Sequence, residues 1–483
     1  MPIRRLLVAV VLVVLALLAT ALLGFRITAI AHFHLEPWHT YVPHELHARD
    51  IDRASWAQYL TAEQHLFDEL NQEMRTHLPA DRHSPYNRYD PESRVFPGKL
   101  THDWNRSYIA EPAQAAKGSV VLLHGLTDSP YSLRHFATHF QAKGFVVVAV
   151  RMPGHGTVPA GLTDADWEDW MAATRLAVRE ATRHAPAKAP LYLIGFSNGG
   201  ALAVKYTLDS LHDPQLARPE RLVLVSPMIG VSRFARFAGI AGLPALLPAF
   251  AQAAWLSVLP EFNPFKYNSF PVNAARQSHA LTEAVRQQLV AQGKQPDGLT
   301  ALPPIITYQS LVDATVSTEA IQTELYERLP ANGSELVIFD SNRALGIDDM
   351  LTPSVTALRE RLFAPPARRY GRTLISPRGP GDAQLIARHI AAQATQGSEQ
   401  LLDARYPAGL VSLSHVALPF PADDALYGQQ PDNTQNYGVN LGTLSLRGER
   451  GTLIMDAGSF ARATSNPFFR WMLEHLDSTL EAR

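Results

Sequence analysis

The sequence has no cysteine among its 483 residues. Disulfides, thiolate metal sites, iron-sulfur clusters, a cysteine nucleophile and a lipid-modified cysteine are therefore excluded. An excess of charge of either sign is lacking too, because 43 basic and 45 acidic residues give a net charge of −2. No overall field favours a polyanionic partner, so we expect no nucleic acid to be bound. Any covalent catalysis must use a nucleophile other than cysteine.

The amino-acid composition is typical of a folded protein. Hydrophobic residues make up 46% of the chain, charged residues 18%, and there are seven tryptophans, which excludes a mostly disordered or low-complexity protein. A length of 483 residues corresponds to about three ordinary domains or to one large α/β domain with insertions. The chain is long enough to bury a sizeable core.

A long apolar run occupies the amino-terminal segment. The residues from Leu6 to Phe25 are almost all strongly apolar or alanine, and Arg4 and Arg5 precede them. A helix of about 20 residues spans about 30 Å, which matches the bilayer hydrocarbon. By the positive-inside rule we expect residues 1–30 to be a transmembrane anchor, with the body extracytoplasmic, on the periplasmic side. The alternative is a signal peptide cleaved near Ala19 to Ala21, which would give a secreted form.

Residues 31–112 form an extension rich in histidine and tryptophan. Its histidines gather near the start, at His32, His34, His39, His44 and His47. The spacing of His44 and His47 is not that of a helical zinc motif, whose two histidines lie four positions apart. We therefore expect solvated histidines here and no metal site.

Short apolar runs then alternate with helical patterns over residues 113–227. Strands are predicted at 119–123, 145–150, 191–194 and 222–225, and helices at 131–142, 164–183 and 198–211. A Thr163 to Asp166 pair resembles a capping box at the start of the second helix. Buried strands that alternate with helices predict a mostly parallel sheet with helices on both faces.

The alternation is interrupted over residues 228–300, which are rich in alanine, leucine and aromatic residues. We expect a helical insertion there, either a lid over an acyl pocket or an ordinary surface subdomain. The sheet pattern resumes over residues 301–483, with strands at 304–308 and 336–339. A strand at 373–376 and a helix at 382–393 predict one extra α/β unit inserted before the end of this part.

The most informative motif is Gly195-Phe196-Ser197-Asn198-Gly199, between a predicted strand and a predicted helix. This is the pattern of a nucleophile elbow, a turn so tight that both glycines are needed and the serine oxygen projects from the sheet. Gly200 adds a second small residue after it. Ser197 is therefore the candidate nucleophile, and a merely structural serine at this turn is the alternative.

A second motif, residues 124–130, follows the first strand of the predicted sheet. In an acyl-transfer site one backbone N–H after the nucleophile and one from this early loop must face the developing oxyanion. Asn198 and Leu126 are the predicted donors. We expect His124 to fix the loop rather than to act as the base, because it lies beside the oxyanion glycine and precedes the serine.

With these motifs the chain resembles the α/β-hydrolases of the monoacylglycerol lipase or carboxylesterase-like group. Arg151 to Gly156, with its Pro-Gly-His-Gly turn, is similar to a loop typical of that group. The resemblance covers about Lys117 to Phe339. It implies an α/β-hydrolase fold and an acid after the strand that follows the lid, which Asp313 would supply. The alternative for Asp313 is a turn aspartate that caps the helix from Ser317.

The expected histidine is missing from its usual place in this group, directly after the strand at 336–339. The order Ser, Asp, His leaves His389, His415 and His475. His389 and His475 lie in patterns typical of helix faces. His415 lies in a loop after the extra unit, between a serine and a proline, so it is the candidate base. A structural histidine is the alternative.

The resemblance and the motifs together predict a serine hydrolase that cleaves carboxylic esters through Ser197, Asp313 and His415, with no cofactor and no metal. The expected partners are a small-molecule or lipid ester and, through the amino-terminal helix, a membrane; the oligomeric state stays open. A peptidase or an acyltransferase on the same fold is an alternative. So is a non-catalytic binding protein, which the long gap from Asp313 to His415 would explain.

Overall fold

The computed structural model describes most of the chain. The described residues are 34–230, 248–295, 297–313, 315–340, 353–364, 366–379, 381–406, 413–432, 434–442 and 463–481. The predicted anchor, residues 1–30, lies outside them. Within these ranges the structure contains no helix with the length and apolar character to cross a membrane.

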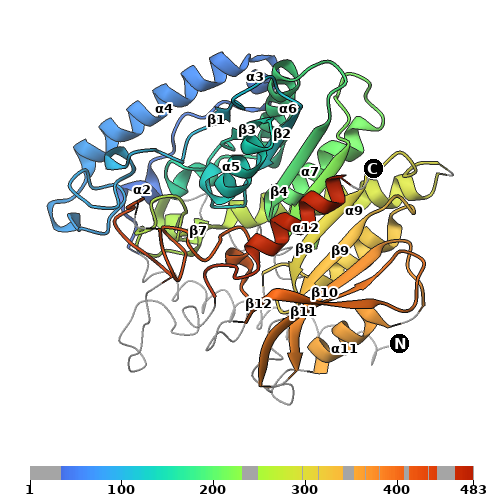
Figure 1. Ribbon diagram of the computed structural model, residues 1–483. Coiled ribbons are helices and arrows are strands. Elements are labelled where there is room, and N and C mark those ends of the chain that lie inside the picture. Colours follow the sequence, from blue (N-terminus) through green and yellow to red (C-terminus); the bar gives the residue numbers. More distant parts are fainter. Residues whose placement is uncertain are drawn as a thin grey trace, which may run out of the picture.

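A ten-stranded sheet forms the centre of the molecule (Figure 1), with the strand order β1-β3-β2-β4-β5-β8-β9-β10-β11-β12. The strands are β1 Tyr108–Ala110, β2 Gly118–Leu123, β3 Phe145–Val150, β4 Leu191–Phe196, β5 Arg221–Val225, β8 Ile305–Ser310, β9 Glu335–Phe339, β10 Gly371–Gly379, β11 Asp382–Ile390 and β12 Ser398–Arg405. All pairs from β3 to β10 are parallel, whereas β1, β11 and β12 pair antiparallel at the two edges. The predicted mostly parallel sheet is confirmed.

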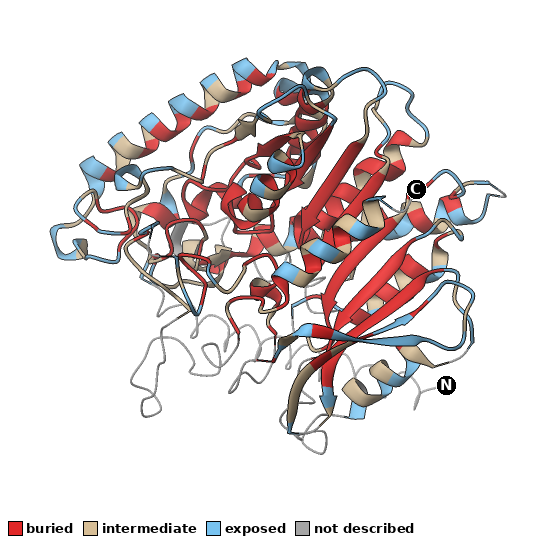
Figure 2. Ribbon diagram, in the orientation of Figure 1, coloured by how far each residue is buried: buried red, intermediate tan, exposed pale blue. Residues whose placement is uncertain are grey.

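Helices cover both faces of the sheet, because the side chains of each strand alternate between two hydrophobic clusters. Val121 and Leu123 of β2 face the cluster that includes helices α6 and α7, while Val120 and Leu122 face the cluster that includes α5 and α12. The central strands are accordingly buried on both sides (Figure 2). The long helices are α5 Arg134–Ala142, α6 Trp167–His184, α7 Asn198–Ser210, α9 Val272–Gly293, α11 Pro353–Phe363 and α12 Phe469–Glu481.

Several short helical elements connect the long helices and the strands. They are η1 Ala80–Arg82, η2 Pro97–Lys99, η3 Pro130–Leu133, η4 Pro159–Thr163, α10 Thr318–Ala320, the π-helical η8 Ile321–Leu325, η9 Tyr326–Arg328 and η12 His415–Ala417. The capping box predicted at Thr163 lies slightly later than expected. Asp166 is the N-cap of α6, and its partner is Asp169.

The amino-terminal extension packs directly on the sheet and its helices. It contains α2 Pro37–Thr40, α3 Ala48–Arg53 and α4 Trp56–His77, and α4 begins at a Ser55/Gln58 capping box. Ile51, Trp56 and Tyr59 belong to the same hydrophobic cluster as α6 and α7. The extension therefore shares the core of the sheet.

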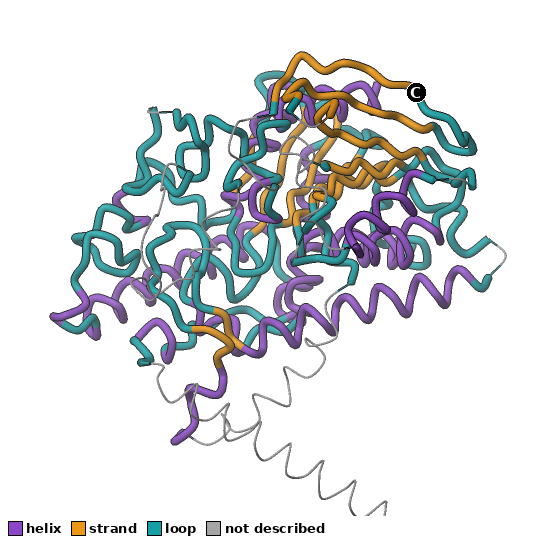
Figure 3. Tube along the Cα trace, turned by 90° about the horizontal axis from the view of Figure 1, so that it is seen from below, coloured by secondary structure: helices purple, strands orange, loops and turns teal. Residues whose placement is uncertain are grey.

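Part of the predicted insertion, residues 231–247, lies outside the described residues. The rest comprises η7 Pro248–Ala254, the antiparallel pair β6 Trp255–Ser257 and β7 Phe270–Pro271, and the long helix α9. The pair β6-β7 lies apart from the main sheet (Figure 3). Leu281, Val285 and Leu289 of α9 are fully buried in the cluster that α7 shares.

The prediction of a helix at 382–393 is wrong, and with it the prediction of an extra α/β unit there. The segment Asp382–Ile390 is strand β11, a hairpin partner of β10. Its alanine, glutamine, leucine and arginine favour a helix, but Leu385 and Ala387 alternate into the core with the period of a strand. The predicted strand at 373–376 is confirmed within β10. The sheet is thus extended by three strands beyond β9.

Candidate active site

Ser197 occupies a strained turn between β4 and α7. Its φ of 54° and ψ of −117° lie in a region that non-glycine residues rarely adopt. Strand β5 and the loop after it fix the turn: the Ser197 N–H donates to the carbonyl of Val225 at 3.0 Å, and the Ser197 carbonyl accepts from the N–H of Met228 at 2.9 Å. The turn holds the serine at the carboxyl edge of the parallel sheet, where ligands bind in open α/β sheets.

The positions of Gly195, Gly199 and Gly200 leave no room for a side chain. A Cβ on Gly195 would lie 2.6 Å from the Cα of Gly200, and one on Gly199 would lie 2.7 Å from the carbonyl oxygen of His124 and nearer still to that of Leu123. A Cβ on Gly200 would lie 2.6 Å from Pro227. The helix therefore approaches its neighbours more closely than any side chain permits.

Asp313 follows β8 and accepts four hydrogen bonds. Its Oδ1 accepts from the N–H groups of Thr315 at 2.8 Å and Val316 at 3.0 Å, and its Oδ2 accepts from Gln309 at 3.1 Å and His415 Nδ1 at 2.9 Å. Burial alone would raise the pKa of Asp313, but the imidazole of His415 and the two N–H groups hold that pKa below its ordinary value. The carboxylate is therefore ionised at neutral pH.

His415 begins η12 and is 8% exposed. Its ring stacks on Phe196, with 5.2 Å between the ring centroids, and Phe196 is the residue directly before Ser197. The neighbouring Ser414 hydroxyl donates to the carbonyl of Ala463 at 2.6 Å and fixes the loop. With Nδ1 bound to Asp313, Nε2 is the nitrogen left to exchange a proton with a hydroxyl. The structure thus brings Asp313 and His415 together beside the turn that carries Ser197.

His124 fixes its loop, as the sequence indicated. Its Nδ1–H donates to the carbonyl of Gly125 at 2.9 Å, and its Nε2 accepts from the N–H of Met152 at 3.1 Å. Burial lowers the pKa of His124 to about 4, so the ring stays neutral. Both ring nitrogens are engaged, which excludes this histidine as the base.

The two predicted oxyanion donors lie at one edge of the sheet. Asn198 is the first residue of α7, where backbone N–H groups have no acceptor within the helix. Leu126 lies in the loop after β2, which pairs in parallel with β4. The Asn198 side chain accepts a hydrogen bond from Ser278 of α9 at 2.9 Å, so the insertion reaches the elbow. The sequence patterns gave no sign of this contact.

The other two candidate histidines lie elsewhere. His389 on β11 and His475 on α12 both face Glu335, with Nδ1 of His389 at 3.3 Å and Nε2 of His475 at 3.5 Å from its Oε1. The position directly after β9, where the resemblance led us to expect the histidine, is held by Asp340, which is fully buried and forms an ion pair with Arg359 at 3.6 Å.

Over the part of the chain that the structure describes, no three His, Asp or Glu side chains are grouped so that they could hold a metal ion. Two of the crowded histidines of the extension bind individual acidic partners instead. His44 contacts Glu69 at 2.8 Å, and His47 contacts Asp169 at 3.3 Å.

Two comparisons of sequence identify similar proteins. Residues 114–341 match the family model described as Serine aminopeptidase, S33. The thermostable monoacylglycerol lipase of Bacillus sp. (strain H-257) is 30% identical over 97 residues, which are 20% of this chain and 38% of that enzyme. The alignment therefore spans well under half the length of this relative.

Solved structures similar to this chain include lipolytic enzymes and esterases. One solved chain, from work on the two metagenome-derived lipolytic enzymes LipS and LipT, is matched at 20% identity with a TM-score of 0.39, over 54% of this chain and 96% of that chain. A soluble variant of the monoglyceride lipase from Saccharomyces cerevisiae, in complex with a substrate analog, is matched at 15% identity and a TM-score of 0.37, over 48% and 81% of the two chains.

Proposed function

We propose that the protein is an α/β-hydrolase, as the sequence motifs predicted, and that it acts as a serine hydrolase of carboxylic esters. The match of residues 114–341 to the family model described as Serine aminopeptidase, S33, supports this proposal. The observation that carries the proposal is the hydrogen bond from His415 to Asp313 beside the elbow of Ser197. An acid, a base and a strained serine are the parts that nucleophilic acyl transfer needs.

In the proposed mechanism Ser197 Oγ attacks the ester carbonyl carbon while His415 Nε2 takes the hydroxyl proton. The oxyanion that forms is stabilised by the N–H groups of Leu126 and Asn198. His415 returns the proton to the leaving alcohol as the tetrahedral intermediate collapses to an acyl-enzyme. Water then attacks the acyl-enzyme by the same steps. Asp313 orients the imidazole and stabilises its charged form without taking the proton.

The proposed substrate is a lipid ester. The insertion at residues 228–300, of which 231–247 lie outside the described residues, is proposed to act as a lid over the acyl site. The contact of Ser278 in α9 with Asn198 supports a role of this insertion at the elbow. Residues 1–30 anchor the protein in a membrane with its body on the periplasmic side, which would bring the site close to a lipid surface. Fractionation of cells that express the chain with and without residues 1–30 tests the anchor, and the chain without them should leave the membrane fraction.

The test of the proposed function compares the full chain, purified in detergent, with its Ser197→Ala and His415→Ala variants on chromogenic esters of increasing acyl length. We expect both changes to lower kcat by a factor on the order of 10⁶. His389→Ala is the matched control, because this histidine faces Glu335 rather than Asp313, and it should retain activity. An optimum at long acyl chains would support the lid.

Two further readouts separate the alternatives. Matched amide substrates test for a peptidase, and product analysis with added alcohol tests for an acyltransferase. A folded protein that neither turns over esters nor reacts with a fluorophosphonate would contradict the proposal and favour a binding protein.

A further inference from the structure

The amino-terminal extension, which lies outside the family match, supplies a buried carboxylate to the loop of residues 151–157. The side chain of Glu45 is 7% exposed, and its two oxygens bind the Arg151 guanidinium at 2.7 and 3.0 Å. Oε1 also accepts from the N–H of Gly154 at 2.9 Å. A bidentate pair of this kind restricts orientation as well as distance.

Arg151 is held by a second acid of the extension. Glu63 accepts from its Nε at 3.0 Å and also accepts from the N–H of Ser107 at 2.9 Å. The two carboxylates keep the pKa of Arg151 above its ordinary value, although burial alone would lower it. Because Glu63 still balances the arginine when Glu45 loses its charge, the buried cation keeps a partner.

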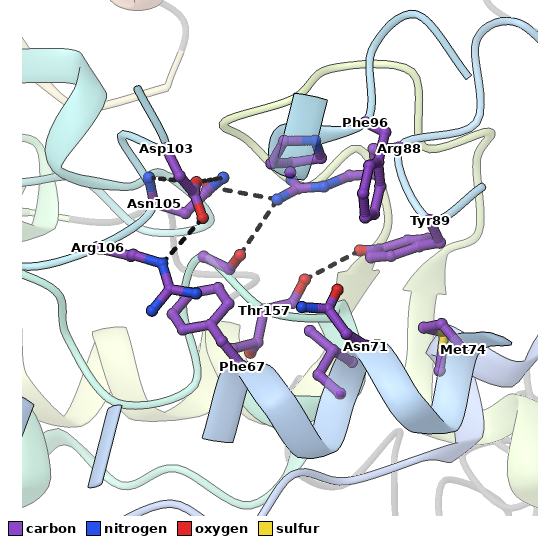
Figure 4. Close-up of a pocket in the computed structure, with 14 residues that line it drawn as sticks. Phe67, Asn71, Met74, Arg88, Tyr89, Phe96, Asp103, Asn105, Arg106 and Thr157 are labelled. Atoms are coloured by element: carbon purple, nitrogen blue, oxygen red, sulfur yellow. Dashed lines mark hydrogen bonds and ion pairs between the residues drawn. The ribbon is translucent and has the colours of Figure 1, made fainter. Parts of the chain in front are cut away.

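The extension also holds the far end of the same loop (Figure 4). Arg88 donates to the carbonyl of Gly156 at 3.2 Å, and the hydroxyl of Tyr89 donates to the carbonyl of Thr157 at 3.3 Å. These contacts border a cavity of about 70 Å³ between α4 and the loop. Both ends of the loop are thus bound by residues of the extension.

His124 connects the 151–157 loop to the proposed oxyanion site by hydrogen bonds. The N–H of Met152, the residue after Arg151, donates to Nε2 of His124, whose Nδ1–H donates to the carbonyl of Gly125. Leu126, a proposed oxyanion donor, follows directly. The ring of His155 packs on that of His124, with 5.0 Å between centroids.

We propose that Glu45 is a positioning residue, which acts through the 151–157 loop and His124 to hold the Leu126 N–H in line with the developing oxyanion. The inference rests on the proposed function. An oxyanion donor is effective only at hydrogen-bonding distance from the place where the charge develops, and a displacement of about 1 Å can cost a factor of about 10². A correctly placed N–H stabilises the transition state much more than the bound ester, so its displacement should change kcat more than KM.

The test measures kcat and KM of the full chain and of Glu45→Gln on the ester that the wild type hydrolyses fastest. A glutamine must turn its N–H₂ group toward Arg151. In place of Oε2 this group loses one bond of the bidentate pair, and in place of Oε1 it also loses the bond from the Gly154 N–H. We expect kcat to fall by a factor of about 10 to 10² with KM changed less than about threefold, because one oxyanion donor is displaced rather than removed. Glu45→Asp, which keeps the charge, should recover part of kcat.

A second readout is specific to the oxyanion site. An alkylboronic acid forms a tetrahedral, anionic adduct when the Ser197 oxygen bonds to boron and His415 takes the proton. Its inhibition constant should rise by the same factor as kcat falls. Titration with a fluorophosphonate corrects each variant for its fraction of folded sites, so a loss of folding alone does not imitate the effect.

The matched control is Asp52→Asn. Asp52 also joins the extension to the body, through Arg175 at 2.8 Å, but it contacts none of residues 151–157. Its kcat should stay within about twofold of wild type. Equal kcat in Glu45→Gln and wild type, or a rise of KM with unchanged kcat, would overturn the inference. If Glu45→Gln does not fold, the same criteria apply to Glu45→Asp. A wild type without Ser197-dependent turnover would instead refute the proposed function.

Discussion

His415 donates a hydrogen bond to Asp313 at 2.9 Å across 102 positions of the sequence. An asparagine at position 313 could present its N–H₂ group to the imidazole and favour the wrong tautomer. We expect Asp313→Asn to lower kcat by a factor of about 10⁴ with little change in KM. Steady-state kinetics measure the effect, with the exposed Asp432→Asn as control. A variant that keeps more than about a tenth of the activity would refute the role of Asp313.

The close approach of α7 to β2 predicts that Gly199 cannot be replaced. In Gly199→Ala the new methyl group would overlap the carbonyls of Leu123 and His124, so we expect loss of several kcal/mol of unfolding free energy or no folded protein. Gly379→Ala is the control, because nothing lies within 4 Å of its Cβ position, and its effect should stay within about 0.5 kcal/mol. Urea denaturation measures both, and equal midpoints would contradict the prediction.

Asp424 joins the segment after His415 to the body of the protein. Its fully buried carboxylate binds Arg134 at 2.7 Å, His135 at 2.8 Å and the Tyr131 hydroxyl at 3.1 Å. Asp424→Asn leaves the buried guanidinium of Arg134 without its counter-charge, so we expect a loss of about 3–5 kcal/mol in urea unfolding.

The control for this prediction is Glu474→Gln. Glu474 pairs with Arg470 on the surface, where their side chains are 62% and 92% exposed, and such exposed pairs are worth about 0–1 kcal/mol. If both variants unfold at the same urea concentration, the buried pair of Asp424 does not contribute as described.

The contact of His389 with Glu335 predicts a pH-dependent stability. The hydrogen bond that His389 donates to the Glu335 carboxylate raises the pKa of His389. A raised pKa in the folded state gives stability that is fully present below the unfolded value of about 6.5 and is lost as the pH rises through the folded value. His389→Gln should therefore lower Tm more at about pH 5.5 than at about pH 9. Because the side chain is 45% exposed, the effect should be small. An equal decrease at both pH values, measured by calorimetry, would contradict it.

The elbow was predictable because its determinants are local. Ser197 and the glycines around it lie within six positions, and the strand before and the helix after have clear apolar patterns. The parallel strands from β2 to β9 were predictable for the same reason, since strands buried on both faces are continuous apolar runs.

The parts that the sequence did not reveal depend on contacts between distant segments. Strand β11 has residues that favour a helix, and only its pairing with β10 and β12 makes it a strand. The bond between Glu45 and Arg151 joins residues 106 positions apart. The residues next to Glu45 in the sequence do not indicate that it binds Arg151, and those next to Arg151 do not indicate Glu45. Local sequence patterns therefore could not predict this pair.

The three strands β10, β11 and β12 lie between Asp313 and His415, the proposed acid and base, in the sequence, and this order has a consequence for biosynthesis. Ribosomes add about 5–20 residues per second, so His415 emerges roughly 5–20 seconds after Asp313, which lies 102 positions earlier. A nascent chain in that interval holds the proposed nucleophile Ser197 and the proposed acid Asp313 but not the proposed base. Reactivity would therefore be acquired only after the sheet has been extended to its last strand, and an incomplete translation product that ends before residue 415 would stay inert.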